Sequence, residues 1–207
     1  MAGIGMYGVF YTKCAKKDGV VTGYTGGVKT MGKAISANFE PSTPDDNPLY
    51  ANNGVAENDS SGASGGSLTL TLDRLTQDVA ADLFGLKVEE VRVKVGDEPG
   101  EEVAGKALKY TGNEQSEPVG VAFVRAHQID GSRDNHEVVL YREATFAAPK
   151  ESTKTMGEKI EWQTPEISGA VAGRDAEGNP WYQSVMFPTQ AAAIAYINEQ
   201  LKDAEGD

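Results

Sequence analysis

Cysteine is almost absent from this chain of 207 residues, because Cys14 is the single one. An internal disulfide is therefore excluded, and we expect a protein made in a reducing cytoplasm. No apolar run approaches the length of a membrane-spanning helix, and the N-terminus lacks a cationic, apolar signal sequence. We accordingly expect no membrane partner.

Basic residues are also scarce. Lys and Arg total 19 against 31 Asp and Glu, which gives a net charge of −12. Binding nucleic acid through its phosphates needs clustered Lys and Arg, and this balance argues against it. Residues 1–44 carry five Lys against Asp18 and Glu40, a net of +3, which leaves −15 for the remainder. This asymmetry fits either a self-assembling surface or an ordinary acidic domain.

Histidine is limited to His127 and His136. A hairpin with residues 131–134 as its loop can bring the two rings together, but no Cys or third His completes a metal site. We therefore interpret both as polar histidines beside a turn. Asp45, Asp46 and the nearby Asn residues lack EF-hand spacing, so calcium has no support. The signatures of serine hydrolases, zinc peptidases and phosphate loops are absent.

Two further features resemble functional sites but have simpler structural explanations. Gly3-Ile-Gly5-Met-Tyr-Gly8 matches a dinucleotide-binding pattern, yet such a site needs a preceding strand and a following helix. We interpret it as a flexible N-terminal arm before a first strand. Cys14 lies among lysines that can lower its pKa, but without a local His it is interpreted as incidental. We predict a protein that is not an enzyme, with no catalytic, cofactor-binding or metal-binding residues and no cofactor.

Alternating apolar residues predict a mainly β fold. Residues 66–73 are the clearest case, since Leu68, Leu70 and Leu72 alternate with Ser and Thr. Further strands are predicted at residues 9–11, 28–39, 90–95, 103–110, 118–126, 136–147, 154–162, 164–171 and 181–187. Thr76 and Gly85 delimit a mid-chain helix, and Thr189 caps a C-terminal helix within 188–204. We predict one β-sandwich or half-barrel domain over residues 1–207.

A long polar segment, residues 39–66, interrupts the strand pattern. It is acidic and contains no Lys or Arg. Long segments without regular structure are uncommon in compact domains and indicate function or disorder. Pro48, Leu49, Tyr50 and Ala51 lie at its centre. A linker gains nothing from this Leu-Tyr pair, whereas an arm that docks onto a neighbour needs an apolar anchor.

The order of these features resembles the major tail tube proteins of long-tailed, siphovirus-type bacteriophages and prophages of Gram-positive hosts. The resemblance is carried by the glycine-rich start before residues 9–11, by Asp46-Asn47-Pro48-Leu49-Tyr50-Ala51-Asn52, by residues 66–73 with 75–85, by Thr164-Pro-Glu-Ile-Ser-Gly169 and by residues 181–187. It covers most of the chain in order. The Asn-Pro-Leu-Tyr-Ala piece is the most specific, and the glycine-rich start is weak.

The resemblance implies a structural virion protein with a tail-tube β-sandwich and a flanking helix. Rings, expected to be hexameric, would join their inner sheets into one barrel and stack into a tube that passes genomic DNA during ejection, without binding it specifically. The long loop would bridge subunits, and we carry this role to Pro48, Leu49, Tyr50 and Ala51. Implied partners are further copies of the chain and the tape measure, tail terminator and distal tail or baseplate proteins. The implied location is the virion tail, after the host cytoplasm.

A second interpretation is a monomeric β-sandwich that binds carbohydrate or decorates a virion or cell surface. Trp162, Trp181, Tyr182 and Tyr141 can form a platform on which sugars stack. Their parity within the predicted strands also fits a core, which is the usual fate of such aromatic residues.

Overall fold

The computed structural model describes residues 2–17, 20–42, 47–51, 54–59, 65–95, 102–149, 163–173 and 180–204. This part of the chain is mainly β, as the sequence predicts, and it contains two helices. The strands are β1 (Ala2–Lys17), β2 (Val20–Gly32), β3 (Ala34–Pro41), β4 (Asn47–Ala51), β5 (Gly54–Asp59), β6 (Gly65–Leu72), β7 (Lys87–Lys94), β8 (Glu102–Lys109), β9 (Val119–Ile129), β10 (Ser132–Phe146), β11 (Glu166–Ala172) and β12 (Tyr182–Phe187). The helices are α1 (Gln77–Phe84) and α2 (Gln190–Gln200).

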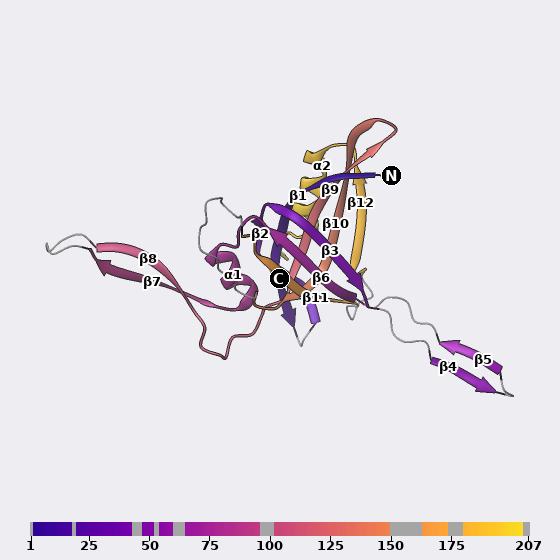
Figure 1. Cartoon of the computed structure of the whole chain (residues 1–207), viewed down its shortest axis with the longest axis horizontal. Helices are drawn as coiled ribbons and strands as arrows, with labels where there is room; N and C mark the ends of the chain where they lie inside the picture. Colours follow the sequence, from indigo (N-terminus) through magenta and orange to yellow (C-terminus); the bar gives the residue numbers. More distant parts are fainter. Residues whose placement is uncertain are drawn as a thin grey trace, which may run out of the picture.

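Eight strands form one antiparallel sheet with a fork at β10 (Figure 1). Its order is β2-β1-β9-β10-β11-β6-β3, and β12 also pairs with β10. The first part of β10, His136–Tyr141, pairs with β12, whereas Ala144–Phe146 pairs with β11. A register irregularity between Tyr141 and Ala144 separates these two segments. Because β12 and β11 share the same side of β10, the sheet divides there into two layers, which gives a β-sandwich-like fold.

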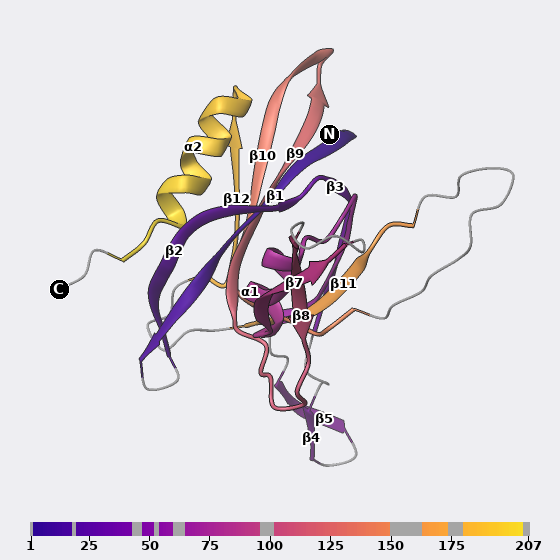
Figure 2. The ribbon, with the colours of Figure 1, turned by 90° about the vertical axis from the view of Figure 1, so that its left-hand side faces the viewer.

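Strand β9 lies at the centre and is buried on both faces. On one face, Val119, Val121 and Phe123 join a core covered by β6, β11 and α1. On the other face, Ala122 and Val124 pack with α2. Figure 2 shows the two helices on opposite sides of the central strands. Successive residues of a strand point to opposite faces, so a near-continuous apolar run is what such a central strand requires.

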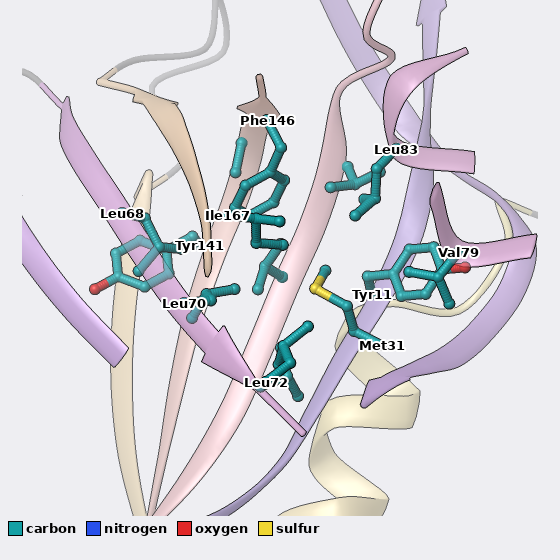
Figure 3. Packing of buried hydrophobic residues seen from close by; sticks show 14 of the residues in the cluster. Tyr11, Met31, Leu68, Leu70, Leu72, Val79, Leu83, Tyr141, Phe146 and Ile167 are labelled. Atoms are coloured by element: carbon teal, nitrogen blue, oxygen red, sulfur yellow. The ribbon is translucent and has the colours of Figure 1, made fainter. Parts of the chain in front are cut away.

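The predicted alternation in β6 is confirmed. Leu68, Leu70 and Leu72 are fully buried, and Figure 3 shows them in the main core. The other residues labelled there are Tyr11, Met31, Val79, Leu83, Tyr141, Phe146 and Ile167. On the outer face, hydroxyl groups pair across strands: Ser36 donates to Thr71 at 2.8 Å, and Thr69 lies 3.0 Å from Ser168. The leucine face of β6 therefore builds the core, and its hydroxyl face links β6 to the neighbouring strands.

Both predicted helix caps are confirmed. The Thr76 hydroxyl accepts a hydrogen bond from the Val79 amide at the start of α1, and Gly85 ends this helix with a φ of 66°. The Thr189 hydroxyl accepts from the Ala192 amide at the start of α2. A side-chain oxygen at this position satisfies one of the free amide groups of the first turn, which fixes where each helix begins.

Two predicted features at the start of the chain are wrong. The glycine-rich start is not a flexible arm, since Ala2 to Lys13 pair with β9 as part of β1. The single strand predicted at 28–39 is divided at Lys33. The Asp73 carboxylate accepts a hydrogen bond from the Lys33 amide at 2.8 Å, and the Lys33 carbonyl accepts from the Asp73 amide at 3.0 Å. The break between β2 and β3 therefore lies where the chain bonds to a residue that is distant in sequence.

Helix α1 is tied to the first two strands through Asp82. The buried Tyr11 hydroxyl donates to the Asp82 carboxylate at 2.9 Å, and the Lys13 and Lys29 amines lie 3.2 and 2.7 Å from it. Burial alone would raise the pKa of Asp82. Hydrogen bonds from Lys29, Tyr11 and Lys13 outweigh burial, so that pKa lies below its ordinary value of 3.8.

We expect Asp82→Ala to lower the free energy of unfolding by about 1–3 kcal/mol, because the buried Tyr11 hydroxyl loses its acceptor. The folded chain binds the Asp82 proton more weakly than the unfolded chain does. This contribution is therefore complete above pH 3.8 and is lost as the pH falls through the lowered folded value. Urea unfolding measured at neutral and acidic pH checks both the size and the direction of this effect.

Asp78→Ala is the matched control for Asp82→Ala on the same helix. Asp78 forms an exposed ion pair with Lys106 at 2.9 Å, and exposed pairs contribute less than about 1 kcal/mol. Equal destabilisation by the two substitutions would show that Asp82 is not the anchor of α1.

Candidate assembly interface

Three strands of the eight-stranded sheet have only one neighbour within the described residues. β2 pairs with β1, β3 pairs with β6, and β12 pairs with β10. Among the described residues, β3 and β12 therefore present edges open to further pairing, whereas the edge of β2 is partly covered. The Ala204 amide donates to the Tyr24 carbonyl at 3.0 Å, and the Gly27 amide donates to the Asp203 carboxylate at 2.8 Å. Exposed strand edges are templates for pairing with another chain unless the protein covers or blunts them.

An open groove lies between the edge strands β3 and β12. Its volume is about 480 Å³, and it is lined by Ala37, Asn38, Phe39, Arg125, Tyr141, Trp181 and Tyr182. The ring centroids of Phe39 lie 5.0 Å from Tyr141 and 5.6 Å from Trp181. Tyr141 is buried at the fork, whereas 37% of Tyr182 is exposed. Of the aromatic residues considered for a core or a platform, Tyr141 is buried in the core, Trp181 is half-buried and Tyr182 is exposed at the groove. Trp162 lies outside the described residues.

A polar cluster follows the groove residue Arg125 along the same face of the sheet. The Glu137 carboxylate lies 2.6 Å from His127 Nε2, accepts from the Ser184 hydroxyl at 2.5 Å, and lies 3.9 Å from Arg125. Burial would raise the pKa of Glu137, but its bonds to Ser184 and His127 outweigh burial and lower that pKa. Ser184 donates to the carboxylate and not to the imidazole, so the cluster lacks the nucleophile–base contact of a serine hydrolase.

The predicted hairpin near the histidines forms, but it does not bring the two rings together. Its turn is Asp130-Gly131, both with positive φ, and not residues 131–134. His127 lies opposite Asn135, and His136 lies opposite Ala126. Paired residues share a face and neighbours alternate, so the two rings are on opposite faces. Among the described residues, no group of three His, Cys, Asp or Glu side chains is placed to hold a metal ion.

The segment around Pro48, Leu49, Tyr50 and Ala51 forms regular structure. Residues 47–51 are strand β4, which pairs with β5 in a two-stranded sheet separate from the main one. The expectation of an extended loop without regular structure is therefore wrong for this part of the arm. Figure 1 shows the hairpin beyond the end of β3, projecting away from the main sheet. Asp45, Asp46, Asn52 and Asn53 lie outside the described residues.

A second projecting hairpin, β7–β8, also forms a separate sheet (Figure 1). The sequence predicts both strands, at residues 90–95 and 103–110. Val91 is 41% exposed, Val93 57% and Val103 51%. Val93 pairs with Val103, so these valines share one apolar face. Sequence analysis missed this surface, because alternation shows that a face is apolar and does not identify what covers it.

The basic N-terminal segment does not form an open basic face. Lys13 lies 3.1 Å from Glu117 in addition to Asp82, and Lys29 also contacts Asp82. Lys16 lies 2.6 Å from Glu143. Three of the five lysines that give this segment its positive charge therefore neutralise acidic groups of the same chain.

Lysines do not activate Cys14. Burial and the nearby Glu143 carboxylate raise the pKa of this thiol to about 12, against a smaller lowering effect of Lys16. The thiol donates to the Arg142 carbonyl at 3.6 Å. The possible activation considered from the sequence is wrong, because Lys16 is paired with Glu143 and the sulfur lies within the sheet.

We expect Cys14 in the folded chain to react with iodoacetamide at pH 8 about a hundredfold or more slowly than in urea, because only the thiolate attacks. The measurement is alkylation followed by mass spectrometry, with the urea-unfolded chain as the control. Equal rates in the two states would contradict the raised pKa.

Comparisons with known proteins leave the family open. No protein-family model and no curated protein sequence matches this chain. Neither helix in the described part of the chain is long and apolar enough to cross a membrane.

Proposed function

We propose that the chain is a structural subunit that assembles with copies of itself into rings and a tube, as the tail tube of a long-tailed bacteriophage. The observation that carries this proposal is a sheet whose strands β3 and β12 each pair with a single neighbour within the described residues, together with two hairpins that leave it. A head-to-tail contact between copies pairs each open edge with the next subunit and closes a ring when the rotation allows.

The two hairpins support self-assembly through their stability. An isolated two-stranded hairpin is marginally stable in water, and it becomes stable with a third strand or a packing partner. Hairpin β7–β8 exposes a valine face, and its base is tied to α1 by the ion pair of Lys106 with Asp78 at 2.9 Å. Beyond this base, a neighbouring subunit is the partner that would cover the valines.

The charge of the chain supports a channel that passes DNA. The net charge is −12, and three N-terminal lysines are paired within the chain. A predominantly acidic wall repels phosphates and prevents adhesion of the DNA as it moves. Proposed partners are the tape measure, tail terminator and distal tail or baseplate proteins, and the proposed location is the virion tail.

A monomeric binding or decoration module is the second candidate function. The aromatic groove beside β12 favours it, because exposed Trp and Tyr rings are suitable surfaces for stacking sugars. The first function requires an oligomer and the second a monomer, so measuring the oligomeric state distinguishes them.

We expect the concentrated full-length protein to form rings or tubes in negative-stain electron microscopy. Deletion of residues 45–58 should give a folded monomer that no longer polymerises, because the projecting hairpin is lost while the main sheet is intact. Circular dichroism checks the fold and sedimentation velocity checks the oligomeric state. Tubes formed by the truncated chain would overturn the role of the arm. A strictly monomeric full-length protein whose tryptophan fluorescence changes with added oligosaccharide would favour the second function.

We expect Val93→Lys to weaken self-association by about tenfold or more, because it places a charge on the apolar face of β7–β8. Ala104→Lys is the matched control, since Ala104 is exposed on the neighbouring strand position and alternation places it on the other face. Sedimentation velocity at several concentrations measures both. Equal effects of the two substitutions would show that general charge, and not the valine face, controls association.

A further inference from the structure

The groove between β3 and β12 has the features of a receptor for an extended chain segment. Within the described residues, each of the two strands that border it pairs with a single neighbour, and an edge strand of this kind can accept a further strand. Its wall is aromatic: Trp181 and Tyr182 lie 5.8 Å apart, and Tyr141 and Tyr182 lie 5.6 Å apart, measured between ring centroids. Rings of this kind form the anchors of protein interfaces.

The charged residue at this groove is Arg125. Its guanidinium lies 5.4 Å from the centroid of the Phe123 ring and 3.9 Å from Glu137, and 40% of its side chain is exposed. The guanidinium stacks on the Phe123 ring and is attracted by the Glu137 carboxylate, and both contacts hold it at the groove. Its remaining N–H groups are available to bind another acceptor. An acidic segment with apolar residues matches this combination of rings and positive charge.

The chain itself carries such a segment. Residues 41–64 contain four acidic residues, Asp45, Asp46, Glu57 and Asp59, and no Lys or Arg. Residues 48–50 of the same segment are Pro-Leu-Tyr. The hairpin that they belong to begins after β3 and points away from the main sheet (Figure 1), so the groove of another copy is its natural acceptor.

We propose that the aromatic groove between β3 and β12 receives the β4–β5 hairpin of a second copy of this chain. The proposal rests on the self-assembly proposed above and names its contact. Hairpin and groove are different surfaces of one molecule, so each copy donates one hairpin and accepts another. The contact is therefore head-to-tail and can repeat from copy to copy.

Photo-crosslinking of the full-length chain tests which surface accepts the hairpin. A benzophenone amino acid replaces Tyr50, and equal amounts of isotope-labelled and unlabelled copies are mixed, assembled and irradiated. Mass spectrometry is expected to find peptides that join position 50 to residues 37–39 or 181–182 of the other isotopic form. Crosslinks to another segment, or only within one copy, would overturn the proposal and leave tube assembly standing.

Substitution of the groove provides the second test. We expect Tyr182→Ala to weaken association in sedimentation velocity by about tenfold or more, because it removes an anchor ring. Tyr110→Ala is the matched control, since Tyr110 is 57% exposed and lies away from the groove; it should associate like the unchanged chain. Equal association of the two variants would overturn the groove as receptor. Failure of the unchanged chain to associate at any concentration would overturn the proposed function as well.

Discussion

Backbone pairing is the constraint on which the rest of this molecule depends, because each strand residue other than proline carries a donor and an acceptor that need partners. At the centre the requirement is met: β9 pairs with β1 and β10 and is covered on both faces. At β10 the need for backbone pairing produces a fork, because each residue on one side of a strand can pair with only one neighbouring strand. β12 and β11 occupy successive parts of that side, and their divergence leaves free edges at β12 and β3, with the aromatic groove between them.

Local signals explain which parts of the fold the sequence predicts. The leucines of β6 and the Thr caps of both helices act within a few residues, so a single sequence reveals them. The division at Lys33 depends on Asp73, and the strand at the glycine-rich start depends on pairing with β9. Such tertiary contacts override propensity and leave no local signal. The segment around Leu49 stands out because an apolar pair interrupts a polar stretch, but its pairing as a hairpin has no local signal. Alternation in β7 predicts a strand and does not show whether its valines are covered.

The internal ion pairs change the meaning of the charge asymmetry. The excess of lysines in residues 1–44 suggests a basic face for an acidic neighbour, but Lys13, Lys16 and Lys29 bind carboxylates of their own chain. These pairs join β1 and β2 to α1 and β10, so they serve the fold. In the proposed assembly, attraction between copies would then come mainly from edge pairing, the valine face and the aromatic groove, with Arg125 as a local exception.

The remaining acidic surplus opposes association at long range. Copies that each carry −12 repel one another, and this repulsion acts over about 10 Å at 0.1 M ionic strength. Edge hydrogen bonds and apolar contacts act only at contact distance, so two copies must first approach against the repulsion. A hairpin that projects from the body would make this first contact while the two bodies are still apart, and Arg125 at the groove would offset the acidic residues of the arm. In the proposed assembly, a projecting arm would let a strongly acidic subunit remain dispersed until its specific contacts are engaged.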